Sequence, residues 1–175
     1  KPVFGYEIRL VDDAGRDVTA PQVPGEAWVR SETACFYYWR KYRQSRETFI
    51  GPWTRTGDQL FFDDDGFFWF HGRANDLFKV SGLWVSPLEI EAALTGHEAV
   101  REAAVVPMQD DGGLTRPEAW IVLAEGWQFT TALQGALDEA VRRLGGYKVP
   151  ARYRITEALP RTTLSKIDRR ALRGG

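Results

Sequence analysis

The chain has 175 residues, enough for one ordinary domain or two small ones, and 43% of them are hydrophobic, so a packed core can form. A formal net charge of −1 provides no positive field that would attract nucleic acid. It also lacks the acidic excess that is typical of disordered chains. The single cysteine, Cys35, excludes an internal disulfide framework, no apolar run approaches the roughly 20 residues of a membrane span, and residues 1–10 do not resemble a signal peptide. We therefore expect a cytoplasmic protein without a nucleic-acid or membrane partner.

The first part of the chain predicts short antiparallel strands. Residues 6–18 alternate apolar and polar side chains around an Asp/Gly turn, which favours a hairpin, and residues 26–30 predict a second strand. Residues 37–48 carry aromatic and basic side chains at helical spacing, typical of a short surface helix. Residues 57–71 predict two strands joined by the turn at 63–66. Together these patterns indicate a small antiparallel β unit.

A helix is predicted over residues 87–94. Ser86 and Glu89 have the spacing of a capping box, in which each side chain bonds to the other residue's backbone N–H. Pro87 stands at the first helical position, where its missing N–H costs nothing, and Gly96 is placed to end the helix. The side chains expected to face inward are Leu88, Ala92 and, as a further candidate, Ile90.

Strands flank a second predicted helix. Residues 102–106 and 118–123 are apolar strands, and Thr131 with Gln134 has the spacing of another capping box. The expected apolar stripe of this helix is Leu133, Leu137, Val141 and Leu144. A Gly-Gly pair ends the helix, and a strand over residues 153–155 and a polar tail follow. Helices interleaved with strands after a β unit predict an α+β fold in two parts.

Four short motifs stand out in order along the chain. They are Thr56-Gly57-Asp58, Gly72-Arg73, Lys79-Val80-Ser81-Gly82 and the segment from Pro160 to Lys166. Each alone is weak, but the ordered set resembles the adenylate-forming superfamily of acyl-CoA and aryl-CoA ligases, peptide-synthetase adenylation domains and luciferases. The segment KVSGLWVSP, residues 79–87, is most similar to that of benzoate-type aryl-CoA ligases.

The resemblance implies a domain plan. Residues 1–72 would be the β subdomain that ends a large N-terminal AMP-binding domain, residues 73–75 the hinge, and residues 76–175 the compact C-terminal α+β cap domain. Asn75 would be the hinge residue, where many relatives have Asp or Lys. The family's phosphate-binding Ser/Thr/Gly-rich loop and its carboxylate pocket do not occur in this sequence. We therefore expect the C-terminal portion of a longer ligase, inactive in adenylation without its N-terminal domain.

The resemblance also implies a reaction in two halves. A carboxylate attacks the α-phosphorus of ATP to give an acyl-adenylate and pyrophosphate, and the thiol of CoA then attacks the acyl carbon and releases AMP. ATP and CoA are the expected cofactors, with Mg²⁺ held by the N-terminal domain. The expected substrate is a small, aromatic carboxylic acid.

Three residues match the family's adenylation groups. Asp58 would accept hydrogen bonds from the ribose, and Arg73 would reach the ribose with its planar donor fork. Lys166 would bridge the substrate carboxylate and the α-phosphate, although the family usually has Gly where this chain has Ser165. Without the family context, a turn cap is the better interpretation of Asp58 and a surface ion pair that of Arg73, and Lys166 can be a solvated lysine of a basic tail.

Two residues match the thiolation half. Lys79 and Gly82 would line the pantetheine tunnel, where a residue without a side chain lets the thiol arm pass close to the backbone. A plain strand-end lysine is an equally good interpretation of Lys79. His71 and His97 have no metal-ligand partner at useful spacing, so no metal site is expected in the chain.

Two other functions remain open from the sequence. One is an adenylation domain that loads a carrier protein, for which a flanking phosphopantetheine site would be the sign. The other is a non-enzymatic, stand-alone binding module built from this domain.

Overall fold

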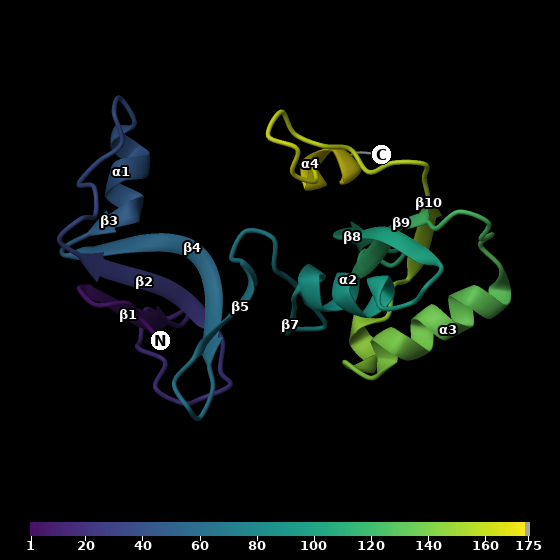
Figure 1. Ribbon diagram of the computed structural model, residues 1–175, viewed down its shortest axis with the longest axis horizontal. Coiled ribbons are helices and arrows are strands. Elements are labelled where there is room, and N and C mark those ends of the chain that lie inside the picture. Colours follow the sequence, from purple (N-terminus) through teal and green to yellow (C-terminus); the bar gives the residue numbers. More distant parts are fainter. Residues whose placement is uncertain (174–175) are drawn as a thin grey trace. The chain divides into compact units, whose positions relative to one another are not determined.

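Figure 1 shows the computed structural model, which describes residues 1–173. The chain divides into two compact units, the first spanning Lys1–Asn75 and the second beginning at Asp76. Antiparallel strands dominate the first unit, and the second combines helices with a mixed sheet, so the predicted α+β fold class is confirmed. The boundary lies directly after the predicted hinge residue, Asn75, and a rotation there stays a prediction.

The first unit is one antiparallel sheet with a short helix. Its elements are β1 (Tyr6–Val11), β2 (Gly25–Ser31), α1 (Tyr42–Thr48), β3 (Phe49–Ile50), β4 (Trp53–Phe62) and β5 (Phe68–Arg73). The strand order is β1-β2-β4-β3, with β5 paired to β4. The predicted turn between β4 and β5 is present: Asp63 accepts hydrogen bonds from the Trp69 indole and the Phe67 N–H, and these bonds hold the pKa of its carboxyl below the usual value.

Two predictions for the first unit need correction. The hairpin over residues 6–18 has its turn, but the second arm is only an isolated bridge between Val11 and Asp17, and the strand that pairs along the whole length of β1 is β2. The helix predicted over residues 37–48 is confined to α1, since Arg40 adopts a φ of +55°, outside the helical region.

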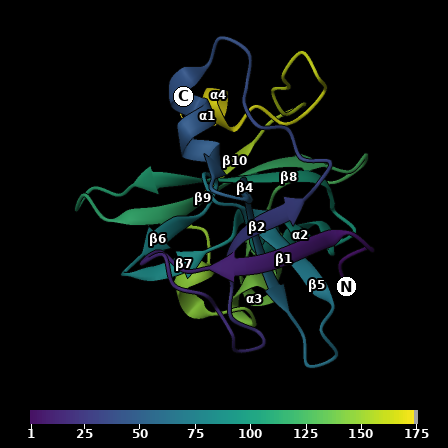
Figure 2. The same ribbon diagram turned by 90° about the vertical axis from the view of Figure 1, so that its left-hand side faces the viewer.

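The second unit is built around a three-stranded sheet. Its elements are β6 (Phe78–Val80), β7 (Leu83–Val85), α2 (Pro87–Thr95), β8 (Val100–Gln109), β9 (Thr115–Leu123), α3 (Thr131–Arg142), the 3-10 turn η1 (Gly146–Lys148), β10 (Arg152–Ile155) and α4 (Arg169–Leu172). β8 pairs antiparallel and β10 parallel with β9, while β6 and β7 form a separate hairpin. Figures 1 and 2 show α3 and α4 on opposite sides of the sheet.

Two apolar clusters form the core of this unit. The larger one packs α2 and α3 on one face of the sheet, with Ile90, Leu94 and Leu137 fully buried. The smaller one lies on the other face, where Leu159 and Leu172 of the predicted polar tail pack against β8 and β9. The tail is therefore folded, and its widely spaced apolar residues gave no periodic signal in the sequence.

The inward face predicted for α2 is wrong in part. Leu88 and Ala92 are exposed, whereas Ile90 is buried as expected. The buried face is Pro87, Ile90, Glu91 and Leu94, a regular helical stripe that includes a charged residue. A pattern of apolar residues could not find this stripe because Glu91 belongs to it.

The capping boxes also differ from the prediction. α2 begins with Pro87 in its first turn, but the side chain of Ser86 makes no capping hydrogen bond, and Glu89 pairs with Lys148. In α3 the cap is Thr130, one residue before the predicted position, and its hydroxyl accepts from the N–H of Leu133.

The apolar stripe of α3 is shorter than predicted. Leu133, Leu137 and Val141 are buried, but Leu144 is exposed because the helix ends at Arg142. Within residues 1–173, no helix combines the length and the apolarity that crossing a bilayer requires.

Candidate functional site

Asp58 and Arg73 lie opposite each other on neighbouring strands. The β4–β5 register pairs them directly, and Arg73 Nη1 lies 2.9 Å from Asp58 Oδ1 and donates to the carbonyl of Thr56 at 3.2 Å. Gly57 makes this arrangement possible with a φ of +72°, a left-handed conformation that only glycine adopts at little cost. The two residues predicted to share one ligand are therefore neighbours.

The Asp58 carboxylate has unused acceptor capacity. Its Oδ1 atom is buried and makes no hydrogen bond, although Arg73 Nη1 lies 2.9 Å away as an ion-pair partner. The Asp58 side chain as a whole is 29% exposed, so its remaining surface is open to a ligand. A carboxylate with free lone pairs beside a planar donor fork fits a group that carries both hydroxyls and negative charge, as a nucleotide does.

Lys166 stands at the end of a short closed loop. An isolated bridge joins Arg161 to Ile167, and within it the N–H of Thr162 donates to the carbonyl of Lys166 at 2.7 Å. The Lys166 side chain is exposed, and its ammonium has no hydrogen bond or ion pair with residues 1–173. Ser165, where the family usually has glycine, adopts a φ of +60°. The serine thus takes the backbone conformation that a glycine would favour.

Lys79 and Gly82 share the β6–β7 hairpin. The strands are joined by a two-residue turn in which Ser81 and Gly82 have φ values of +50° and +83°, the pattern of a type I′ turn. Lys79 Nζ lies 4.5 Å from the centre of the Trp84 ring, a cation–π contact. A Cβ atom at position 82 would meet no other atom within 4 Å, so the turn itself already explains the glycine.

The predicted site residues therefore fall into three groups. Asp58 and Arg73 are together in the first unit, Lys79 and Gly82 share one hairpin of the second, and Lys166 is on another loop of the second. Asn75 lies at the end of the first unit.

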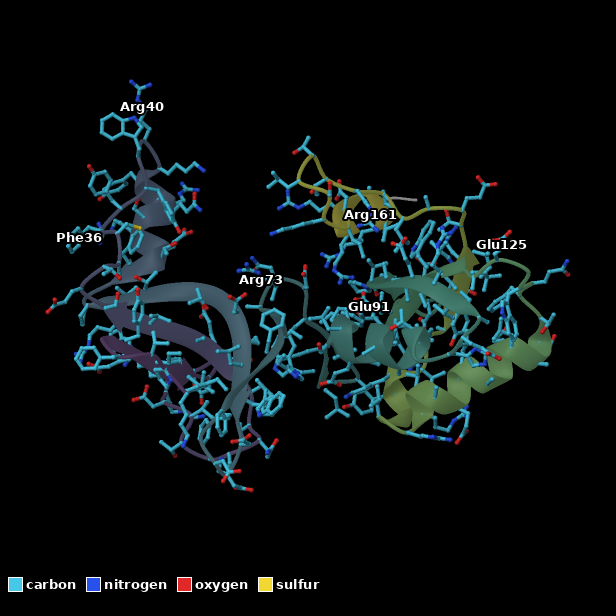
Figure 3. All side chains as sticks on the ribbon, in the orientation of Figure 1. Phe36, Arg40, Arg73, Glu91, Glu125 and Arg161 are labelled. Atoms are coloured by element: carbon cyan, nitrogen blue, oxygen red, sulfur yellow. The ribbon has the colours of Figure 1, made fainter. Side chains whose placement is uncertain are left out.

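The sequence did not predict the buried ion pair between Glu91 and Arg169. Glu91 of α2 is 8% exposed, and Arg169 of α4 binds both of its carboxylate oxygens. Figure 3 labels Glu91. Burial acts to lower the pKa of Arg169, but the hydrogen bonds and charge of Glu91, together with the charge of Asp76, raise it above the ordinary value. The only available signal was a glutamate at a core position of the helical repeat.

The histidines and the cysteine have other surroundings. His71 packs edge-on to Phe61, and His97 accepts a hydrogen bond from the N–H of Ala99. Cys35 is an exposed free thiol. In the described part of the chain, no three His, Cys, Asp or Glu side chains gather closely enough to hold a metal ion.

Comparison with known proteins gives this arrangement a family. Residues 89–166 match the model of the AMP-binding enzyme C-terminal domain. The chain is 41% identical to benzoate–CoA ligase of Thauera aromatica over 99% of its length and 44% identical to 4-hydroxybenzoate–CoA/benzoate–CoA ligase of Rhodopseudomonas palustris over 98%. The crystal structure of the anthranilate CoA ligase AuaEII with anthranoyl-AMP superposes with a TM-score of 0.92 at 42% identity over 99% of this chain.

The α+β second unit, preceded by an antiparallel β unit, has the fold of the corresponding part of the AMP-binding enzymes. The chain belongs to the adenylate-forming superfamily, as its four motifs predicted, and it is most similar to the aryl-CoA ligases among those relatives. It spans about a third of their length: 33% and 32% of the two ligases and 34% of the crystallised chain.

Proposed function

We propose that this chain serves as the C-terminal part of an ATP-dependent aryl-CoA ligase, which activates an aromatic carboxylic acid as its adenylate and transfers the acyl group to CoA. The observation that carries the proposal is the 41–44% identity to ligases named for benzoate and hydroxybenzoate, sustained over 98–99% of the chain. Such identity covers the turns and loops that bear candidate groups as well as the core.

In this proposal Asp58 and Arg73 bind the nucleotide. The exposed part of the Asp58 carboxylate accepts from the ribose hydroxyls, and the guanidinium of Arg73 turns from its ion pair with Asp58 towards the ribose. The ion pair holds Arg73 only weakly, because its guanidinium is about half exposed and solvent screens the attraction.

Lys166 neutralises negative charge at the reacting groups during adenylation. A carboxylate and an α-phosphate repel each other as they approach, and an ammonium between them offsets this charge as the new O–P bond forms and pyrophosphate leaves. The unpaired ammonium of Lys166 is free for that role, since no carboxylate of the described residues neutralises it. Mg²⁺ would be held by residues outside this chain.

Thiolation is assigned to the β6–β7 hairpin. The open space around Gly82 leaves room for the pantetheine arm beside the backbone, and Lys79 is held next to it over Trp84. Asn75, at the boundary between the units, would absorb the backbone change that exchanges the Lys166 loop for this hairpin at the reacting centre.

The test uses the protein encoded by the full reading frame around this sequence. Incubated with ATP, Mg²⁺ and benzoate, it is expected to release pyrophosphate and form benzoyl-AMP, and to convert this to benzoyl-CoA when CoA is added. This chain alone is expected to release no pyrophosphate. Failure with benzoate, hydroxybenzoates and 2-aminobenzoate alike would contradict the aryl assignment.

Two control reactions separate the alternatives. Replacing CoA by a phosphopantetheinylated carrier protein shows whether the acceptor is a protein. Tight binding of ATP by this chain alone, without any pyrophosphate release from the complete protein, would instead favour a binding module.

A further inference from the structure

The loop that carries Lys166 has no apolar anchor of its own. Thr162, Thr163, Leu164, Ser165 and Lys166 are all exposed, so no side chain within the loop packs into the core, and the nearest apolar contact is that of Ile167 with the smaller cluster. Its internal hydrogen bonds close the turn but do not attach it to the rest of the unit. The attachment is made by the residues on either side of it.

On the N-terminal side the attachment is exposed. Arg161 pairs with Glu102 of β8, and its guanidinium also donates to the carbonyl of Ser165 at 3.0 Å. The Arg161 and Glu102 side chains are 46% and 33% exposed, so solvent screens the pair and it contributes little to holding the loop.

On the C-terminal side the attachment is buried. Arg169 lies three residues after Lys166, and the side chains of Arg169 and Glu91 are only 14% and 10% exposed. Arg169 binds Glu91 with both guanidinium nitrogens, at 2.9 Å for Nη2 to Oε2, and donates to the carbonyl of Val105 at 3.3 Å. The N–H of Val105 in turn donates to Glu91 at 2.6 Å. The fork therefore fixes Arg169 to α2 and β8 in one geometry.

The same guanidinium reaches the start of the unit. Arg169 Nε lies 3.7 Å from a carboxylate oxygen of Asp76, the first residue after the boundary that follows Asn75. One side chain thus connects the Lys166 loop, the helix α2 and the segment next to the boundary. A longer distance and a 37% exposed Asp76 make this the weaker of its two ion pairs.

We propose that Arg169 is the positioning residue of Lys166. It touches no reactant; its buried fork to Glu91 and Val105 sets where the exposed loop stands, and its contact with Asp76 ties that placement to the segment beside the boundary. The proposal rests on the proposed function, in which Lys166 acts in adenylation. It predicts that loosening Arg169 harms only the half-reaction that needs Lys166.

The test compares matched variants of the complete protein. Arg169→Lys keeps the charge and loses the fork. The double variant Glu91→Leu/Arg169→Met replaces the buried pair by apolar side chains, a change that a core tolerates far better than the loss of one partner. Arg170→Met is the control, because it removes the same charge from the adjacent, exposed position of α4. Each change is also made in a Lys166→Ala background.

The first measurement is hydrogen exchange, which needs no activity. Amides of Thr162 and Ser165 are expected to exchange about tenfold faster or more in both Arg169 variants, because local opening is easier without the buried anchor. Amides of β9 and all amides of Arg170→Met should be unchanged. Unchanged exchange of the loop would overturn the proposal, even if the complete protein proved not to be a ligase.

The second measurement separates the half-reactions. Benzoyl-AMP formation should slow by about 10- to 100-fold in the Arg169 variants through kcat, since a displacement of about 1 Å can cost about 10²-fold. Thioester formation from supplied benzoyl-AMP should stay within about twofold. In the Lys166→Ala background the Arg169 changes should have no further effect on adenylation, because residues that act as a unit are not additive. Additive losses, or equal losses in both halves, would overturn the positioning role.

Discussion

Lys79 and Lys166, both in the second unit, are held in place by different kinds of contact. Lys79 is on the β6–β7 hairpin, where neighbouring residues pair and Trp84 lies under its ammonium. Lys166 is on an exposed loop flanked by Arg161 and Arg169, whose carboxylate partners are 59 and 78 residues away in the chain. The position of the first lysine is a local property, whereas that of the second depends on tertiary ion pairs.

Under the proposed function, this difference indicates how one domain would serve two reactions. A hairpin stabilised by its own strands keeps its shape whatever distant contacts change. A loop anchored through long-range contacts can be displaced when those contacts change, and one of them involves Asp76 beside the boundary between units. We expect the two lysines to differ accordingly in which half-reaction they serve.

The largest expected effect comes from removing either lysine. In the complete protein, Lys166→Ala should slow adenylation by about 10²–10³-fold, the scale for losing one preorganised charge donor, and largely spare thioester formation from supplied acyl-adenylate. Lys79→Ala should show the reverse selectivity. Rapid-quench assays of each half-reaction measure both. If Lys166→Ala slowed both half-reactions equally, the two lysines would not serve different half-reactions.

A smaller effect is expected from bulk in the β6–β7 turn. Gly82→Leu should impair thioester formation and leave adenylation intact. It should also lower the free energy of unfolding by about 1–2 kcal/mol, because a left-handed φ strains a residue with a Cβ atom.

Gly82→Asn is the control for that strain, since asparagine tolerates the left-handed region better than leucine. Its stability should lie closer to that of the parent protein. If Gly82→Leu still forms the thioester at the normal rate, the passage for the thiol does not run beside this turn.

The smallest effect concerns the two serines with positive φ. Ser165→Gly should raise the free energy of unfolding by up to about 1 kcal/mol, because relief of a left-handed cost of roughly 1–2 kcal/mol exceeds the roughly 0.5–1 kcal/mol of backbone entropy that glycine loses. Ser81→Gly, the same change in the other turn, should act alike. Thermal unfolding measures both, and opposite signs would mean that the loops differ in strain as well as in anchoring.

Local patterns predicted most of the elements. The alternation and turn residues of β4 and β5 placed the Asp63 turn, and the apolar runs found β8 and β9, although both strands extend beyond the predicted bounds. These features depend on neighbours in sequence, so a single chain contains the information. A shared ligand for Asp58 and Arg73 was expected only from the family resemblance, and the register that pairs them directly is a finding of the structure.

Errors arose where distant residues decide a local choice. Leu88 is exposed although it is apolar. Glu91 is buried although it is charged, because Arg169 binds both oxygens of that carboxylate. A capping box at Ser86 was expected, but the side chain of Ser86 makes no capping hydrogen bond. Burying a charge is costly unless it is paired, and a partner 78 residues away leaves no trace in local periodicity.

The sequence by itself determined the succession of strands, turns and helices and the presence of the four motifs, because backbone preferences and short-range spacing act within a few residues. Only the tertiary structure decided which face of α2 is buried, that the tail folds onto the sheet, and what holds the Lys166 loop. Those outcomes depend on charges and apolar side chains that meet only after the chain has closed on itself.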